Sequence, residues 1–262
     1  MPRLAANISW LFTELPLLER PGAARRCGFA AVECLFPYGL MPDDLADSLR
    51  GAETELVMFN LPAGAWEAGE RGLAALPGRQ LDFAASMEVA RRYADRCGTK
   101  QLHVMAGIRA PDIEVERAWD CYVDNLRVAA RAFAQDGISL LIEPINAGDM
   151  PGYFLATLDD ALRAQDAVGA PNLRIQADLY HLQIAGGDLL RRIGEALPRI
   201  GHVQVAAVPD RGEPDNGELR HDDLFRLLDR ECYDGWVGCE YRPRGITEDG
   251  LGWAEPWLLR QA

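Results

Sequence analysis

The chain has 262 residues, of which 48% are hydrophobic, and its 40 acidic and 27 basic residues give a formal net charge of −13. This length is usual for a single α/β barrel, and the apolar content is sufficient for a sizeable core. The negative charge argues against nucleic acid or an anionic membrane as the main partner, because both bind basic surfaces. A small anionic substrate needs only a local cation and is not excluded.

The sequence predicts a cytoplasmic protein. It begins without a long apolar segment and contains no run of about 18 apolar residues, so we expect neither a signal peptide nor a membrane span. The cysteines form no CxxC pair and no zinc-type spacing. We therefore expect reduced, buried thiols, as in cytosolic enzymes.

Short apolar runs of strand length alternate with helical segments along the whole chain. We predict strands over residues 4–10, 30–36, 55–61, 100–106, 138–145, 173–179, 200–206 and 235–241. Several are apolar on both faces, as is typical of buried parallel strands. The segments 79–97 and 115–136 carry apolar residues at helical spacing, and each is followed by a glycine. This pattern predicts an α/β protein with one domain over residues 1–262, a (β/α)8 TIM barrel.

Four polar residues stand at the downstream ends of the last four predicted strands: Glu143, Asp178, Gln204 and Glu240. A buried carboxylate without a partner is costly, so carboxylates at strand ends indicate a functional site. Barrel enzymes carry their catalytic groups at this end of the strands, and the four side chains are expected to converge there. Three carboxylates and an amide offer only oxygen ligands, which suits Mg²⁺ or Mn²⁺.

This arrangement predicts proton-transfer chemistry. Glu143 and Glu240, on the fifth and eighth strands, are expected to flank a bound substrate from opposite sides. Two bases placed in this way suit proton transfer between adjacent carbons through an enediolate. A divalent metal between them would polarise the carbonyl and stabilise the developing charge.

Further residues are candidates for binding the substrate. Arg211, after the seventh strand, is our first choice for holding a substrate carboxylate, the alternative being a solvated loop arginine. His181 follows Asp178 by three positions and either hydrogen-bonds a substrate oxygen or metal ligand or has a structural role. The expected pocket walls are Phe36, Asn60, Trp66 and His103.

The longest irregular stretch, residues 60–78, follows the third strand, and loops of this length are often functional. Within it, Glu70 and Arg71 either pair with each other, which we favour, or line the pocket mouth as substrate-binding residues. Glu33 also ends a strand, and we expect it to pair with a neighbouring base. Trp253 and Trp257 are predicted to be exposed and available for a homo-oligomer interface.

Five segments, in this order and spacing, resemble the hydroxypyruvate isomerase family of the wider xylose-isomerase-like barrel superfamily: NLPAGAWEAGERG, IEPIN, QADLYH, HVQVA with PDRGEP, and GWVGCEYRPRG. The resemblance covers nearly the whole chain. It implies conversion of hydroxypyruvate, a small keto acid, to 2-hydroxy-3-oxopropanoate. It also implies proton transfer by Glu143 and Glu240 and a metal held by Glu143, Asp178, Gln204 and Glu240. Mg²⁺ is the expected ion, with Mn²⁺ or Co²⁺ as alternatives.

Other functions remain open at this stage. The same site would serve a 2-oxo-tetronate isomerase or a related sugar or sugar-acid isomerase or epimerase, although related epimerases commonly place a histidine where Gln204 stands. A metal-dependent nuclease of this superfamily would need more histidine ligands and a basic groove, whereas this chain has four histidines and a negative charge. A non-catalytic sugar-acid binding barrel is disfavoured by the intact pair of Glu143 and Glu240.

Overall fold

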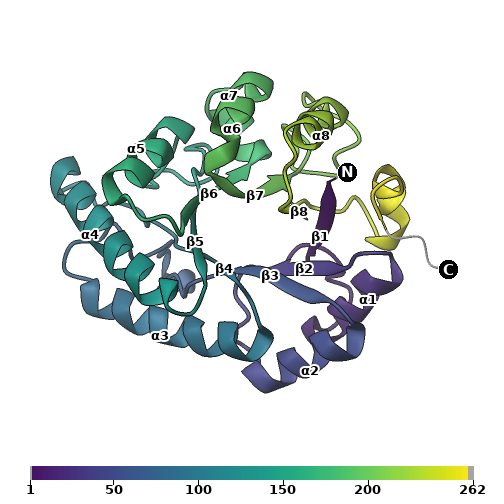
Figure 1. The fold of residues 1–262 in the computed structure, drawn as a ribbon, viewed down its shortest axis with the longest axis horizontal. Helices are drawn as coiled ribbons and strands as arrows, with labels where there is room; N and C mark the ends of the chain where they lie inside the picture. The colour runs from purple at the N-terminus through teal and green to yellow at the C-terminus, as the bar shows by residue number, and fades with distance from the viewer. Residues whose placement is uncertain (1, 259–262) are drawn as a thin grey trace.

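The computed structural model describes residues 2–258, which form a closed barrel of eight parallel strands in the order β1 to β8 (Figure 1). Pairing of β1 with β8 closes the barrel. All eight predicted strands are confirmed, and each ends before its apolar run does, so the last residues of the runs enter the loops that carry the site. The strand bounds are β1 Arg3–Asn7, β2 Ala31–Cys34, β3 Glu55–Asn60, β4 Gln101–His103, β5 Ser139–Ile142, β6 Leu173–Asp178, β7 Ile200–Val205 and β8 Trp236–Cys239.

Helices surround the barrel on its outer side, as Figure 1 shows. The two helices predicted from apolar spacing are confirmed as α3 and α4. Where the structure describes the chain, no helix is both long and apolar enough to cross a membrane. The helix bounds are α1 Arg20–Arg26, α2 Pro42–Ala52, α3 Gln80–Cys97, α4 Val115–Ala134, α5 Leu158–Val168, α6 Leu179–Ala185, α7 Leu189–Ala196 and α8 His221–Arg230, with short 3-10 helices at Leu17–Glu19, Trp66–Ala68, Leu197–Arg199 and Glu248–Ala254.

The main hydrophobic core lies between the strands and these helices. α4 illustrates the pattern, because Tyr122, Leu126 and Phe133 repeat at helical spacing and are fully buried. Gly98 and Gly169 end α3 and α5 with φ angles of 72° and 67°, a left-handed conformation that favours glycine. Such short turns return the chain directly to the next strand and keep the barrel regular.

The barrel interior changes character along its axis. Toward the amino-terminal ends of the strands it holds a small apolar cluster of Ala5, Ala31, Val57, Met58 and Leu141. Toward the carboxyl-terminal ends it is polar, with fully buried Asn7, Glu33, His202 and Gln204. Buried polar groups must be hydrogen-bonded, so this end of the barrel is a connected polar network that leads into the site.

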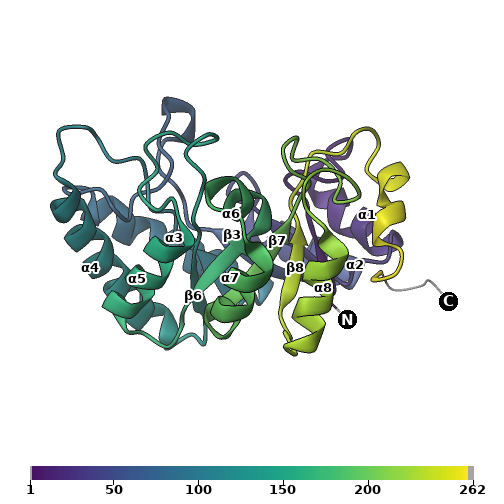
Figure 2. The same cartoon turned by 90° about the horizontal axis from the view of Figure 1, so that it is seen from above.

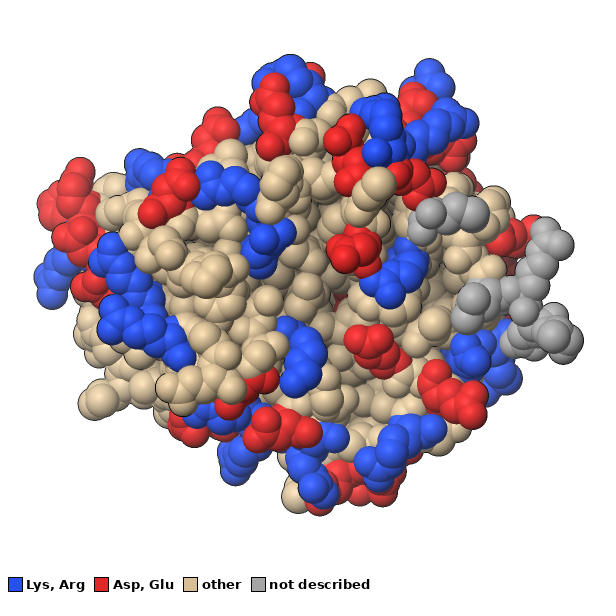
Figure 3. Space-filling model, in the orientation of Figure 1, with Lys and Arg blue, Asp and Glu red and all other residues tan. Residues whose placement is uncertain are grey.

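The two ends of the barrel differ in their loops. Figure 2 shows the loops after the strands gathered on one side, with the chain's N-terminus on the other, and the loop after β3 rises above the rim. Figures 1 and 3 view the end that holds the N-terminus, where acidic and basic side chains are interspersed. This face therefore presents no continuous basic area.

Two expectations about individual residues need correction. Trp253 and Trp257 are half-buried rather than exposed, because Trp253 packs on Tyr241 and Trp257 packs on Phe225. Both tryptophan side chains are thus packed against aromatic residues of the same chain. The cysteines are all free, as predicted, but Cys232 is exposed and only three of the six are fully buried.

Candidate active site

A cavity of about 330 Å³ lies at the carboxyl-terminal ends of the strands. All four predicted wall residues line it, as do both predicted proton-transfer glutamates, His181 and Arg211. The lining residues are Trp10, Leu35, Phe36, Asn60, Trp66, Arg71, His103, Met105, Glu143, Ile145, Asp149, Met150, His181, Arg211, Glu240 and Arg242.

Three buried carboxylates meet at the floor of this cavity. Glu143 follows β5, Asp178 ends β6 and Glu240 follows β8, and none is more than 6% exposed. Burial raises the pKa of Glu143 well above its ordinary value, and the charges of Asp178 and Glu240 raise it further. Burial likewise raises the pKa of Asp178, and it raises the pKa of Glu240 to about 8. A site that disfavours its own negative charge is suited to bind a cation.

Arg211 supplies a positive charge at this floor. Its Nη2 donates to Glu240 Oε1 at 2.7 Å and to Asp178 Oδ2 at 3.3 Å. Its guanidinium also lies 4.9 Å from the centre of the Trp10 ring and 4.8 Å from that of Tyr180. Arg211 is therefore not a solvated loop residue. Its Nε is buried without a hydrogen-bond partner among the described residues.

His181 is held by Asn146. The Asn146 Oδ1 accepts from the backbone N–H of Asp149 at 2.9 Å, which leaves its Nδ2 to donate to His181 Nδ1 at 2.7 Å. The imidazole proton of the neutral ring is thereby assigned to Nε2. Burial lowers the pKa of His181 to about 3, so the ring stays neutral. Its Nε2 lies 3.6 Å from Asp178 Oδ2 and 4.0 Å from Glu143 Oε1, both beyond hydrogen-bond distance.

The Gln204 amide turns its nitrogen toward the carboxylates. Its Oε1 accepts from Gln176 Nε2 at 2.7 Å, whereas its Nε2 donates at 2.7 Å both to Glu33 and to Glu240. The expected role of Gln204 as a metal ligand stays a prediction, and it requires the amide to rotate. Glu33 pairs with a neighbouring base, as expected, since His202 Nε2 lies 2.6 Å from Glu33 Oε2.

The donor set fits a hard divalent cation. Glu143, Asp178 and His181 offer ligand atoms that all lie within 4.8 Å of one another. Glu240 lies beside this group, because Arg211 contacts both Glu240 and Asp178. Carboxylate oxygens predominate, which favours Mg²⁺ or Mn²⁺ over a soft metal. In the assigned tautomer the His181 Nε2 carries the proton, so its participation as a ligand would require the proton to move to Nδ1.

The loop after β3 is arranged differently from our expectation. Glu70 pairs with Arg79, not with Arg71, and it also accepts from the backbone N–H of Ala65. Glu70 is absent from the cavity lining, so its role in substrate binding stays a prediction. Arg71 does line the cavity, stacked 3.9 Å above the centre of the Trp66 ring.

Sequence reasoning missed three polar or aromatic lining residues. Trp10 follows β1, Asp149 lies in the loop after β5, and Arg242 stands two positions after Glu240. Arg242 lies 5.4 Å from the centre of the Trp10 ring. All three stand just beyond a strand end, so the positional rule that identified Glu143 and Glu240 could have found them.

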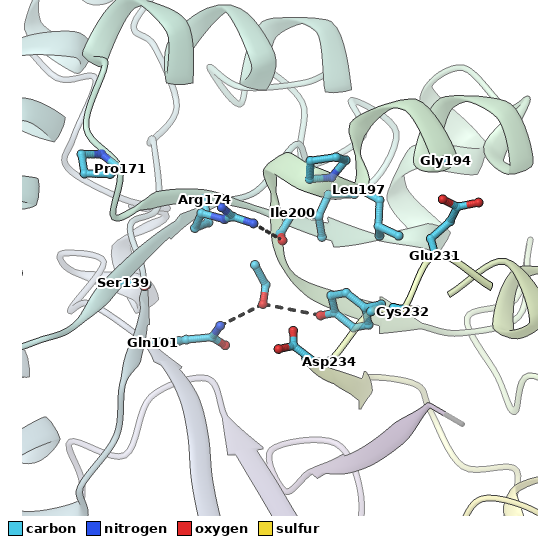
Figure 4. A pocket seen from close by; sticks show the side chains of 14 residues that line it. Gln101, Ser139, Pro171, Arg174, Gly194, Leu197, Ile200, Glu231, Cys232 and Asp234 are labelled. Atoms are coloured by element: carbon cyan, nitrogen blue, oxygen red, sulfur yellow. Dashed lines mark hydrogen bonds between the residues drawn. The ribbon is translucent and has the colours of Figure 1, made fainter. Parts of the chain in front are cut away.

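A second cavity, of about 510 Å³, lies at the opposite end of the barrel (Figure 4). It is lined by the first residues of three strands, Gln101, Ser139 and Ile200, and by Arg174, the second residue of β6. Its polar side chains are engaged with backbone oxygens, since Gln101 donates to Gly201 at 2.8 Å and Arg174 donates to Ile200 at 2.9 Å. This cavity therefore resembles a structural end of the barrel more than a catalytic site.

The protein is a (β/α)8 barrel with buried acidic residues at the carboxyl ends of its strands. This is the arrangement of the barrel enzymes. Residues 21–257 match the family described as xylose isomerase-like TIM barrel. The chain belongs to this family and is an enzyme of the isomerase type.

Three similar proteins show how far the likeness extends. A 2-oxo-tetronate isomerase of Cupriavidus necator is 48% identical, covering 99% of this chain and 100% of the relative. The hydroxypyruvate isomerase of Escherichia coli is 42% identical, covering 98% and 100%. A crystal structure from Brucella melitensis, described as an AP endonuclease of family 2, is 44% identical with a TM-score of 0.97, covering 98% and 100%.

Proposed function

We propose that this protein interconverts hydroxypyruvate and 2-hydroxy-3-oxopropanoate by transferring a proton between two adjacent carbons. The observation that carries the proposal is the placement of Glu143 and Glu240 on the wall of one cavity, with the pKa of both raised by burial. A carboxyl group whose pKa lies near neutrality can both accept and donate a proton at the operating pH. Relatives at 42–48% identity carry isomerase names for this class of substrate.

The proposed reaction moves two hydrogens. One of Glu143 and Glu240 removes a proton from C3 of hydroxypyruvate, and the electron pair forms the C2–C3 double bond of an enediolate. The other glutamate then protonates C2, and the proton of the C3 hydroxyl passes to the C2 oxygen, so that C3 becomes the aldehyde and C2 carries the hydroxyl. In this proposal His181, through its Nε2 proton, and Arg211 donate hydrogen bonds to the substrate oxygens. A divalent cation, when bound by Glu143, Asp178 and Glu240, would stabilise negative charge on these oxygens.

The substrate's carboxylate needs a cation of its own. Arg211 already contacts Glu240 and Asp178, which reduces its availability. Arg71 and Arg242 also line the cavity, and neither makes an ion pair within 4 Å among the described residues. We assign the carboxylate to these two arginines, with Arg211 holding the oxygens nearer the reacting carbons.

A four-carbon 2-oxo-tetronate is the second candidate substrate. The relative from Cupriavidus necator, at 48% identity, carries the 2-oxo-tetronate isomerase name. A cavity of about 330 Å³ holds a chain of either length. For a nuclease, in contrast, the net charge of −13 gives no attraction for a phosphate backbone.

The deciding experiment measures isomerase chemistry directly. The purified protein is incubated in D₂O with hydroxypyruvate or 2-oxo-tetronate, with Mg²⁺, Mn²⁺ or Co²⁺ and with chelator, and deuterium uptake at C3 is followed by NMR. We expect uptake that Glu143→Gln or Glu240→Gln abolishes. Glu213→Gln, which replaces an equally buried carboxylate that pairs with Arg244 outside the cavity, is the matched control. Absence of uptake with every metal would contradict the proposal, and the faster substrate identifies the chain length.

A further inference from the structure

We infer that Glu33 is a positioning residue for Glu240, acting through the side-chain amides of Asn7 and Gln204. This inference rests on the proposed function, because it concerns the placement of a proposed proton-transfer group. Glu33 is fully buried in β2, outside the cavity lining, and it does not contact Glu240 directly. Its influence therefore has to pass through the residues between them.

The connection consists of two bridging amides. Asn7 Nδ2 donates to Glu33 Oε1 and to Glu240 Oε2, at 2.9 Å in both cases. Gln204 Nε2 donates to the same two oxygens, at 2.7 Å in both cases. Each amide thus joins the same two carboxylates, and Glu33 and Glu240 share four hydrogen bonds without touching.

The orientation of both amides is determined by their other partners. The Asn7 oxygen accepts from the backbone N–H of Ser9 at 3.0 Å, and the Gln204 oxygen accepts from Gln176 at 2.7 Å. A flipped amide would set its oxygen against two carboxylate oxygens and leave those acceptors without donors. The Glu33 carboxylate therefore keeps the Asn7 amide protons pointing toward Glu240, and it does the same for Gln204 as long as Gln204 does not rotate to bind a metal.

Glu33 is itself fixed from two further sides. Its Oε2 pairs with His202 Nε2 at 2.6 Å, and both side chains are fully buried. β8, which lies on the other side of β1, leaves room only because position 238 is a glycine, since a Cβ there would lie 2.1 Å from Glu33 Oε2. A buried carboxylate with three donors and no freedom to move is a rigid anchor.

The consequence for Glu240 is that its two oxygens have different roles. Oε2 is held by Asn7 and Gln204, whereas Oε1 is turned to Arg211. Proton transfer from carbon depends on placing the reacting oxygen to within a fraction of an ångström. Loss of Glu33 should thus lower kcat and leave KM nearly unchanged, because Glu33 contacts neither the cavity nor the bound substrate.

The test compares Glu33→Ala and Glu33→Gln in the full-length protein loaded with Mn²⁺. A displacement of about 1 Å costs roughly 100-fold in rate, so we expect Glu33→Ala to lose about this factor in kcat with KM changed less than about threefold. Glu33→Gln keeps an oxygen for both amides and offers an N–H to His202 Nε2, which then accepts with the ring proton moved to Nδ1. It should therefore recover kcat to within about tenfold of the unmodified protein.

Two additional variants keep the test decisive if Glu33→Ala does not fold. Asn7→Leu removes one donor from each carboxylate and should lower kcat by about tenfold. The matched control, Asn172→Leu, removes an amide that donates to Ala130 and Ile138 at the other end of the barrel, and its kcat should be unchanged. Folding of each variant is checked by cooperative thermal unfolding.

The possible results distinguish failure of this inference from failure of the proposed function. Unchanged kcat in folded Glu33→Ala or Asn7→Leu would overturn the inference, as would equal losses in Glu33→Ala and Glu33→Gln. Inactivity of the unmodified protein on both keto acids would instead count against the proposed function. A loss confined to kcat, with rescue by Glu33→Gln, is the result expected from positioning.

Discussion

Arg211 Nη2 donates to Glu240 Oε1 at 2.7 Å, the carboxylate oxygen that the amides of Asn7 and Gln204 leave free. The same guanidinium lies 3.3 Å from Asp178 Oδ2. A divalent cation held by these carboxylates would neutralise the same negative charge. Arg211 and the cation are therefore alternative positive charges for one acidic floor, and binding of the cation would release the guanidinium toward the substrate.

The first prediction concerns the stability of the metal-free protein. Arg211→Gln removes the counter-charge from a buried cluster of three carboxylates, which should lower the free energy of unfolding by about 3 kcal/mol in the presence of chelator. Mn²⁺ should then raise the Tm of Arg211→Gln more than it raises that of the unmodified protein. Arg244→Gln breaks a more exposed ion pair with Glu213 and Asp215 and serves as control, with a loss below about 1 kcal/mol. Equal metal-induced shifts in Tm would contradict the competition.

The second prediction concerns pH. Burial, together with the nearby His202 and His181, lowers the pKa of His103 to about 3. An unfolded histidine titrates near pH 6.5, so between about pH 6.5 and 3 the unfolded chain binds a proton that the native protein refuses. Stability is therefore lost as the pH falls through this window. His103→Gln should reduce the fall in unfolding free energy between pH 7 and 5 by up to about 2 kcal/mol.

This effect can be measured by urea unfolding at the two pH values with chelator present. The raised pKa values of Glu143 and Glu240 act in the opposite direction, because the unfolded chain loses their protons at lower pH than the native protein does. Glu143 and Glu240 are present in both the unmodified protein and His103→Gln. The difference between the two pH dependences of the unfolding free energy therefore reports on His103 alone. An identical pH slope in His103→Gln would show that His103 is not neutral in the native state.

The third prediction concerns the contact of Gly238 with Glu33. A methyl group at position 238 would overlap Glu33 Oε2, so Gly238→Ala should destabilise the protein by about 1–3 kcal/mol. In the double variant with Glu33→Ala the clash disappears. The two substitutions should therefore be non-additive, with a coupling energy of about 1 kcal/mol or more from a double-mutant cycle by denaturant unfolding. Additive effects would mean that the strand relaxes without moving Glu33.

The fourth prediction concerns the substrate carboxylate. Arg71→Gln removes a cation that is stacked on Trp66 at the cavity wall and should raise KM for the keto acid by about tenfold, with little change in kcat. Arg92→Gln removes an exposed arginine of α3 outside the cavity and is the matched control. A fall in kcat without a change in KM would assign Arg71 to the reacting carbons instead.

The sequence predicted the fold and the centre of the site because both depend on short-range patterns. Apolar runs and the glycines after helices were sufficient for eight strands, and the carboxyl ends of those strands led to Glu143, Asp178 and Glu240. Contacts between side chains on distant strands leave no local pattern. The pairing of Glu70 with Arg79, the direction of the Gln204 amide and the position of Arg211 against Glu240 therefore required the structure.

The hydrogen bond from Asn7 to Glu240 joins residues separated by 233 positions. It can form only when β1 and β8 pair and the barrel closes. During synthesis on the ribosome, an incomplete chain that lacks the eighth strand would carry Glu143 and Asp178 but could not position either one against Glu240. The reactive centre is therefore assembled last, so partly synthesised or truncated chains should be inactive even where most of the barrel has folded.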